Sequence, residues 1–534
     1  MGGGPALTRY KIRMANIIKK ILTGLLLLTV AIFSAGCGGG DSDSNDYTPV
    51  DEATAIRYTK EAFTYTFPLV YMYISGVKFT NAPFPTTVSA PVNQISHSDC
   101  IGDANYGQVS NVNRDIVCSQ AFLDLSRDAV VFTKPVTERF CLFELFDGYT
   151  NCVAAMGTGT SNGNTKFIFT GPRYSGYVPS DMTHIKVPTN LARLIGYIRC
   201  DGEEELETVA EIQKQIDLQE YSIYRNNGKQ PGGSFDLKNQ YDPLKKLNSL
   251  TVKEYFDLAN KLMRDNPPAD CDKEILNRIR QIRVGPGLSF DSSIFGESNS
   301  YRYFESIKQQ CMNSEWASDS QVYYFKTSNY NSSVWNFYAS SHLANFATNF
   351  GTDYNYRAFC AYNYVCAHPN SCCLIISKYK DDTDGTTFRG GNRYKLIFQQ
   401  KRLPPRTESG FWSITAYNAR TGMIQTDDYN TVFSVVNDKS DIGENASGTI
   451  EINIEPVSTK KKENRRASRK AEGDGEEPAG DEPVASGSAS LPIYNTNDNF
   501  FLIMRIYLPK EEAINGFWTA PVVNRIEEEK KKDK

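Results

Sequence analysis

The hydrophobic and polar positions of the chain change their spacing along its length, and each spacing predicts a different kind of structure. From about residue 78 to 200, short apolar runs such as 129–133 and 140–146 are divided by Gly, Asn and Pro. Closely spaced runs of this kind favour an antiparallel sandwich or jelly roll over alternating strands and helices. Similar runs return after about residue 390, where 450–454 alternates apolar and polar residues like a half-buried strand. The pattern therefore predicts two separate β domains.

Between the β-rich regions, the apolar residues of about 203–313 recur with helical spacing. A capping box that begins at Thr251 precedes one helix, whose apolar residues fall on a single face. A second helix is expected to end at the Gly-Pro-Gly sequence that starts at Gly285. Ahead of the first β region, a further helix is expected to begin after Thr48 and to break at Pro68.

The N-terminus carries the pattern of an export signal. Residues 21–33 form an apolar stretch that follows Lys19 and Lys20 and precedes Ser-Ala-Gly-Cys37. A membrane-spanning helix needs about 20 apolar residues, so this shorter stretch is typical of a secretory signal. Small residues directly before a cysteine resemble the lipobox of bacterial lipoproteins, and Cys37 is therefore the expected lipidation site. An ordinary signal peptide with a chance cysteine is the alternative.

The expected fold class is mainly β with α, with two jelly-roll-like antiparallel β-sandwich domains and a helical connecting region. A long insertion near the C-terminus carries a basic block and an acidic block among Gly, Ala, Ser and Pro, which cannot build a core. The expected parts are the signal peptide 1–36, a flexible tether 37–47, an N-terminal helix and β domain 48–202, the helical connecting region 203–313, a C-terminal β domain 314–526 with the disordered charged insertion 457–490, and a charged tail 527–534.

The net charge of the chain limits which binding partners we expect. The whole chain has a net charge of −4, and cleavage before Cys37 would remove five basic residues and no acidic ones, giving −9. Clustered Lys and Arg are needed to displace counterions from nucleic acid, so nucleic acid is not an expected partner. The expected membrane contact is a lipid anchor at Cys37, in the bacterial cell envelope and more specifically the outer membrane.

Export also changes the interpretation of the cysteines. Eleven cysteines follow Cys37, and thiols tend to pair in an oxidising compartment, so they are candidates for disulfides with at least one left over. The cluster from Cys360 to Cys373 contains His368 and could instead form a zinc site, although its spacing matches no usual paired pattern. Disulfides or buried thiols are the favoured interpretation of this cluster.

The candidate chemistry of the N-terminal β domain is polar. Asn93, Gln94, His97, Asn113, Asp115 and Asp124 could meet in a β-sandwich, to bind a ligand, to coordinate a divalent metal or to perform acid–base chemistry. His97 and Asp115 are the candidate catalytic residues. The simpler alternative is that Asn and Asp bridge loop backbone and that the histidine is structural.

In the C-terminal domain, Ser413, Thr415 and Tyr417 alternate with apolar residues along one predicted strand. Their hydroxyl groups would share one face and are candidates to line a polar, ligand-binding pocket. An exposed sheet face is the alternative. No P-loop, dinucleotide fingerprint or HExxH motif occurs in the chain.

Several segments carry a family resemblance. NQISH at 93–97 and NRDIVCSQAFLDLS at 113–126 resemble the domain of unknown function 1254, whereas GFWSITAYN at 410–418 and FLIMRIYLP at 501–509 resemble the domain of unknown function 1214. The resemblance implies two jelly-roll-like β domains with a helical part between them. It implies little about activity.

The chain departs from the family pattern at a few positions. Ile116, Val117 and Cys118 stand where the family usually has Thr, Leu and Tyr, and Val432 stands where an Arg is usual. A family site that used this Tyr or Arg would be altered here.

Three functions remain open at this stage. The first is a lipid-anchored envelope protein that binds a carbohydrate-like or other envelope ligand in a polar groove of a β domain. The export signal supports the location, and the rings and hydroxyl groups of the 31 tyrosines suit polar organic ligands. The second is a hydrolase-like enzyme, acid–base or metal-assisted, and the third is a structural or assembly protein. The oligomeric state is left open.

Overall fold

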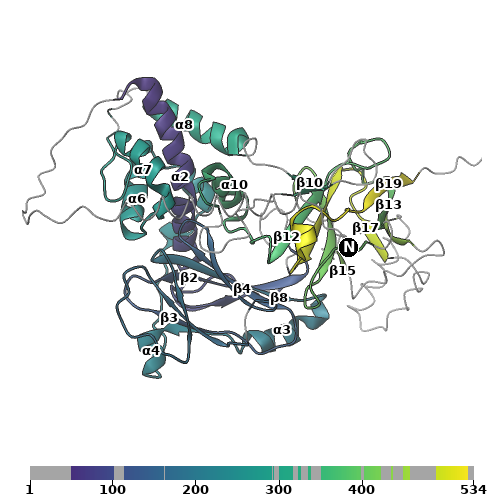
Figure 1. Cartoon of the computed structure of the whole chain (residues 1–534), viewed down its shortest axis with the longest axis horizontal. Helices are drawn as coiled ribbons and strands as arrows, with labels where there is room; N and C mark the ends of the chain where they lie inside the picture. The colour runs from purple at the N-terminus through teal and green to yellow at the C-terminus, as the bar shows by residue number, and fades with distance from the viewer. Residues whose placement is uncertain are drawn as a thin grey trace, which may run out of the picture. The chain divides into compact units, whose positions relative to one another are not determined.

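The computed structural model describes residues 50–101, 113–160, 163–291, 293, 300–316, 323–325, 335–337, 350–398, 402–422, 434–436, 449–457 and 489–526 (Figure 1). The signal peptide, Cys37, the tether, Val432 and nearly all of the charged insertion lie outside the described residues.

The first described element is helix α2 (Glu52–Phe79), which Asp51 caps at its N-terminus. The helix continues through Pro68, so the predicted break at this residue is wrong. A proline inside an exposed helix costs roughly 3 kcal/mol, because it removes one backbone hydrogen bond. Here Phe67 and Leu69 on either side are fully buried, and their packing outweighs that cost.

The helical part is built around α2, and the helices that contact it include α6, α7, α8 and α10 (Figure 1). The α6 helix begins with the predicted capping box, in which the side chains and backbones of Thr251 and Glu254 exchange hydrogen bonds. Trp316 stacks on Phe63 of α2 with ring centroids 5.7 Å apart, inside one shared hydrophobic core. Besides α2, the α-helices of the described residues are α3 (Leu206–Gln213), α4 (Tyr221–Arg225), α5 (Pro243–Asn248), α6 (Val252–Asp265), α7 (Lys273–Ile279), α8 (Ser300–Gln310), α10 (Tyr354–Tyr364) and α12 (Glu511–Ile514).

Two sheets make up the N-terminal β domain. Phe132 and Phe143, from opposite sheets, meet in its core with ring centroids 4.8 Å apart. One sheet has the order β1 (Ser96–His97), β2 (Ile116–Asp124), β8 (Leu191–Arg199), β4 (Cys141–Asp147), β5 (Cys152–Gly157). The other has the order β7 (Thr183–Lys186), β6 (Lys166–Thr170), β3 (Val130–Thr133), β9 (Asp217–Glu220).

The C-terminal β domain is a second pair of sheets around its own core. Trp412 and Phe398, from the two sheets, lie 5.4 Å apart between ring centroids. One sheet has the order β10 (Tyr323–Phe325), β11 (Trp335–Phe337), β12 (Cys373–Lys378), β18 (Phe500–Tyr507), β14 (Trp412–Asn418), β15 (Ser434–Val436). The other has the order β17 (Ala489–Ile493), β16 (Ile450–Pro456), β13 (Arg393–Phe398), β19 (Val522–Ile526).

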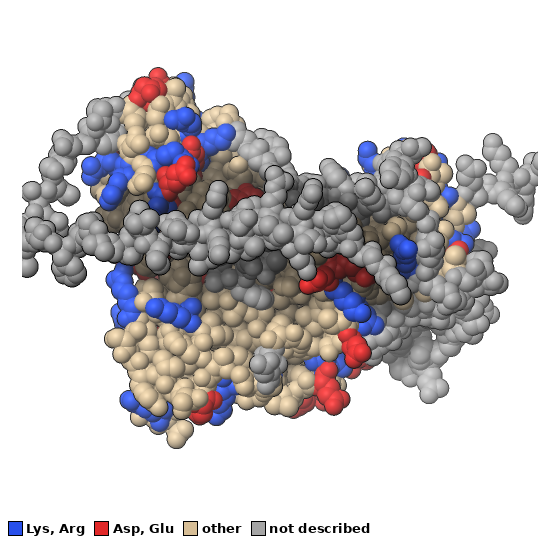
Figure 2. All heavy atoms as spheres, in the orientation of Figure 1, with Lys and Arg blue, Asp and Glu red and all other residues tan. Residues whose placement is uncertain are grey.

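The chain is thus mainly β with α, as its sequence predicts. The strand pairs are antiparallel except β6 with β7 and β16 with β17, among the described strands, so each sandwich includes one parallel pair. No helix of the described residues is both long and apolar enough to cross a membrane. On the face shown in Figure 2, Lys and Arg side chains are interspersed with Asp and Glu over the helical part.

Candidate functional site

The hydroxyl-bearing strand of the C-terminal domain alternates as its sequence predicts. Trp412 and Ile414 of β14 point into the core between the two C-terminal sheets. Ser413 and Thr415 occupy the other face, and both are fully buried. This face is therefore not the exposed sheet face that the sequence left open.

Residues of the N-terminal domain cover that hydroxyl face. The Ser413 hydroxyl donates a hydrogen bond to Oδ2 of Asp115, which stands just before β2. The amide of Asn113 donates to the hydroxyl of Tyr507 in β18, and its oxygen accepts the backbone N–H of Asp115 at 2.9 Å. Candidate residues from both β domains thus meet in one cluster.

An arginine that the sequence analysis did not select lies at the centre of this cluster. Arg505 of β18 pairs with Ser413 of β14, and its Nη1 donates to the Tyr417 hydroxyl at 2.9 Å. Burial raises the pKa of Tyr417 and holds that of Tyr507 well above its ordinary value, so both side chains stay neutral donors and acceptors. Arg505 and Tyr507 belong to the RIYLP segment of the family resemblance, which was the one available signal for them.

We call the residues Asn113, Asp115, Ser413, Thr415, Tyr417, Arg505 and Tyr507 the buried polar cluster. Its members other than Asn113 are at most 3% exposed. None of them lines the cavities described below. A polar network that is closed and hydrogen-bonded fixes how two surfaces pack, and the cluster accordingly joins the two β domains.

His97 lies apart from this cluster. Its Nδ1 shares a hydrogen bond of 2.8 Å with the hydroxyl of Ser119, the residue opposite it in β2. Ser119 and Asp115 are four residues apart, which is about 13 Å along an extended strand. Partial burial lowers the pKa of His97, which favours the neutral ring. The two candidate catalytic residues are not brought together.

Asn93, Gln94 and Asp124 lie where β2 ends. The Asn93 amide donates to the Glu220 carboxylate at 2.9 Å, and its oxygen accepts the backbone N–H of Asp124 at 2.9 Å. The amide of Gln94 donates to the carbonyl of Pro231 at 2.7 Å. Asn93 and Gln94 therefore bridge loop backbone, whereas Asp124 borders a cavity and its Oδ1 accepts the backbone N–H of Ser126 at 2.9 Å.

The eleven described cysteines are all free thiols, so the disulfides expected from the sequence are not observed. His368 instead pairs with Glu144, at 3.0 Å between Nδ1 and Oε2. Glu144 is fully buried in β4, and a lone acid within the apolar run FCLFELF was the sequence signal for this pair. The described residues contain no group of three His, Cys, Asp or Glu suited to a metal ion.

A cavity of about 520 Å³ lies beside the N-terminal β domain, and we call it the α2 cavity. Tyr73 of α2, Asp124 at the end of β2 and Lys261 of α6 are among its lining residues. Asp265 also borders it, and its ion pair with Arg264 lowers the pKa of this carboxyl. The α2 cavity therefore offers an aromatic ring, a cation and acids at one place.

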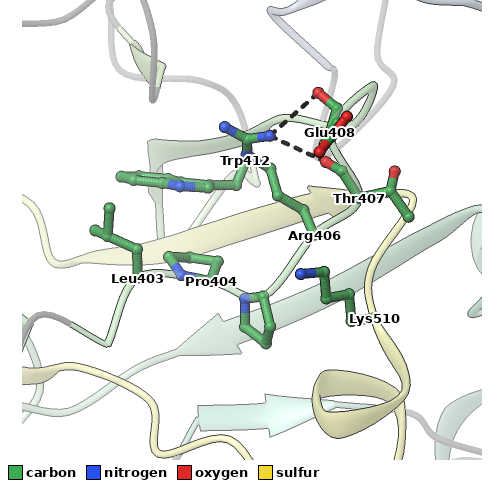
Figure 3. A pocket seen from close by; sticks show the side chains of 8 residues that line it. Leu403, Pro404, Arg406, Thr407, Glu408, Trp412 and Lys510 are labelled. Carbon is green, nitrogen blue, oxygen red and sulfur yellow. Dashed lines mark hydrogen bonds between the residues drawn. The ribbon is translucent and has the colours of Figure 1, made fainter.

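A second cavity of about 360 Å³ opens on the C-terminal domain (Figure 3). The ring of Trp412 and the side chain of Leu403 form its apolar side, and Lys510 lies at the other. Arg406 is held by its Nη1, which donates to the backbone carbonyls of Thr407 at 3.0 Å and of Glu408 at 3.4 Å.

Two protein families match parts of this chain. Residues 92–220 match the family described as "Protein of unknown function (DUF1254)", and residues 374–471 match "Protein of unknown function (DUF1214)". No curated protein matches the chain.

Two solved structures are similar to it. The VPA0106 protein from Vibrio parahaemolyticus is 17% identical, with a TM-score of 0.61 over 89% of this chain and 100% of that one. This likeness shows the fold alone. An uncharacterized protein from Burkholderia cenocepacia is 10% identical, with a TM-score of 0.38 over 89% of this chain and 95% of that one, and supports no conclusion. The chain therefore carries a DUF1254 match in its N-terminal β domain and a DUF1214 match in its C-terminal β domain, which supports the paired-domain family that its sequence resembles.

Proposed function

We propose that this protein is exported, anchored to the bacterial outer membrane through a lipid on Cys37, and binds a polar, carbohydrate-like ligand in the α2 cavity. The single observation that supports binding is this cavity of about 520 Å³ with its mixed lining. Cavities that hold small ligands usually measure roughly 300–1,000 Å³ and combine apolar walls with a few polar groups. The anchor rests on the sequence of the first 37 residues.

The lining of the α2 cavity suits a ligand with many hydroxyl groups. The ring of Tyr73 offers a flat surface for a sugar face, while Asp124 and Lys261 offer an acceptor and a donor. Because cations and acids both line the cavity, it favours a polar ligand over a strongly charged one. Asn93 holds the backbone of Asp124 and so fixes where this carboxylate stands.

An enzyme that uses His97 with Asp115 is less well supported. His97 forms a hydrogen bond with Ser119, whereas the buried carboxylate of Asp115 accepts a hydrogen bond from Ser413 in the other β domain. A general acid or base must reach the proton that it transfers, which a closed cluster prevents. The assembly role stays a prediction from the sequence.

Thermal-shift screening of the purified chain against neutral and acidic oligosaccharides tests the binding proposal. We expect at least one saccharide to raise the Tm, and the paired substitutions Asp124→Ala and Lys261→Ala to remove this shift. Lys229→Ala, at an exposed site outside the cavity, is the matched control and should retain it. No stabilising saccharide, or a shift that persists in the cavity variant, would contradict the proposal.

The anchor has its own test, which is independent of the ligand. In a bacterial host, the parent chain should fractionate with the outer membrane and its mature N-terminal peptide should carry lipid by mass spectrometry. Cys37→Ala should move the protein to the soluble fraction, whereas Cys271→Ala, at an exposed thiol, should not. An unmodified peptide from the parent chain would contradict the anchor.

A further inference from the structure

Helix α10 carries a buried arginine whose hydrogen bonds are incomplete. Arg357 is 3% exposed, yet its Nε and Nη2 have no hydrogen-bond partner. Buried polar groups in proteins are almost always paired, and an unpaired buried charge is among the costliest features of a fold. Arg357 therefore needs an explanation beyond packing.

The surroundings of Arg357 form the wall of a separate cavity of about 290 Å³, which we call the Arg357 cavity. Asp147 and Tyr149 interact electrostatically with the guanidinium group, and both line the same cavity together with Asp272. The charged end of Arg357 thus lies among cavity-lining residues. None of these residues lines the α2 cavity.

The acids of this wall already have other partners. Both oxygens of Asp147 accept hydrogen bonds from the amide of Asn151, at 2.9 and 3.2 Å. Asp272 accepts the hydroxyls of Tyr65 at 2.9 Å and Tyr354 at 3.0 Å. Burial raises the pKa of Asp147 to about 6, so this carboxyl stays mostly ionised at pH 7 and takes up a proton only as the pH falls through about 6.

Aromatic rings hold the guanidinium in place without using its N–H groups. The rings of Tyr65, Tyr149 and Tyr354 have their centroids 5.3, 5.4 and 5.2 Å from the guanidinium carbon. Cation–π contacts of this kind offset part of the cost of burial and position the group. They leave Nε and Nη2 without a hydrogen bond in this structure.

The free atoms indicate the class of ligand. Nε and Nη2 lie on one edge of the planar guanidinium, and two parallel N–H groups of this kind match the two oxygens of a carboxylate. Lys186 adds an exposed cation to the lining, and the small volume excludes large ligands. We propose that the Arg357 cavity binds a small organic carboxylate, with Arg357 as its bidentate partner.

Calorimetric titration of the full chain with acetate, succinate and benzoate tests this proposal, with phosphate and chloride at the same ionic strength as separate arms. At least one carboxylate should bind saturably. Arg357→Met should weaken its binding about 10- to 100-fold, which is the loss of charge-assisted hydrogen bonds. Arg357→Lys keeps the positive charge but lacks the two parallel N–H groups of the guanidinium, so it should weaken carboxylate binding less than Arg357→Met. This variant replaces Arg357→Met in the test if the Met variant does not fold.

Arg225→Met, at an exposed arginine of α4, is the matched control and should bind like the parent. The paired substitution of Asp124 and Lys261 in the α2 cavity should also leave carboxylate binding unchanged, which separates this proposal from the saccharide proposal. Absence of saturable carboxylate binding, binding of phosphate in preference to every carboxylate, or equal binding by the parent and Arg357→Met would overturn it.

Discussion

Two arginines of this chain are buried to the same degree and differ in almost everything else. Arg505 and Arg357 are each 3% exposed. Arg505 donates to Tyr417 and lies beside Asp115 in the buried polar cluster, where Ser413 closes the network. Arg357 has two unpartnered nitrogens and borders a cavity.

The difference indicates that one arginine stabilises the fold and that the other binds a ligand. A buried ion with a full set of partners stabilises one arrangement of the surfaces around it, and its loss leaves the partners uncompensated. A buried ion whose N–H groups lack hydrogen bonds costs free energy in that state and gains those hydrogen bonds when a ligand arrives. Substitutions at the two arginines should therefore have opposite effects on stability and binding.

The largest expected effect is at Arg505. Arg505→Met should lower the free energy of unfolding by about 3–5 kcal/mol, because the substitution leaves Asp115 as an unpaired buried carboxylate. Urea unfolding followed by tryptophan fluorescence measures this difference. A loss below about 1 kcal/mol, the range of an exposed ion pair, would show that the cluster does not hold the two β domains together.

A pH effect of similar size is expected beside Arg357. The pKa of Asp147 is about 6 in the fold against an ordinary value of 3.8, so the folded chain binds more protons than the unfolded chain between these values. The parent should therefore lose stability relative to Asp147→Asn as the pH rises from about 4 to 7, by about 3 kcal/mol in total. Urea unfolding of the parent and of Asp147→Asn at each pH in this range measures the difference between their free energies of unfolding. A difference that does not change with pH would contradict the raised pKa of Asp147.

A smaller effect should follow from the hydroxyl that closes the cluster. Ser413→Ala removes the donor to Asp115 and should cost about 1–3 kcal/mol, the penalty for an unsatisfied buried acceptor. Ser175→Ala, at an exposed site, should change stability by less than about 0.5 kcal/mol. Equal effects of the two substitutions in urea would contradict the structural role of Ser413.

The smallest effect on stability is expected at Arg357 itself. Arg357→Met loses cation–π contacts and the positive charge beside Asp147, but Nε and Nη2 have no hydrogen bond to lose, so the free energy of unfolding should fall by only about 1 kcal/mol. Chemical unfolding without added carboxylate measures this change. A cost equal to that of Arg505→Met would place Arg357 among the structural residues and end the contrast.

The sequence predicted those features that local patterns encode. The alternation at 412–417, the capping box at Thr251 and strands such as β4 and β16 follow from side-chain spacing, which the backbone enforces, whereas β9 lies in the region predicted to be helical. The continuation of α2 through Pro68 could not be predicted from the sequence, because packing against distant residues decides whether a helix tolerates proline.

The sites depended on contacts that no local pattern records. Asp115 and Ser413 were both candidates, but only folding places their side chains together. Arg357 stands in the segment YNYRAFC, which contains Tyr354, but nothing in that segment shows that Tyr65 and Tyr149 from two other parts of the chain also lie against it. The same holds for the separation of His97 from Asp115, since two residues in one domain need not share a site.

The most direct test compares the two arginines in a single experiment. The Nε–H signals of Arg357 and Arg505 can be identified in ¹⁵N spectra by their loss in Arg357→Lys and Arg505→Lys, and then followed during titration with succinate. We expect the Arg357 signal to shift saturably while the Arg505 signal stays in place. An unchanged Arg357 signal, or equal shifts of both, would contradict the assignment of one arginine to ligand and the other to structure.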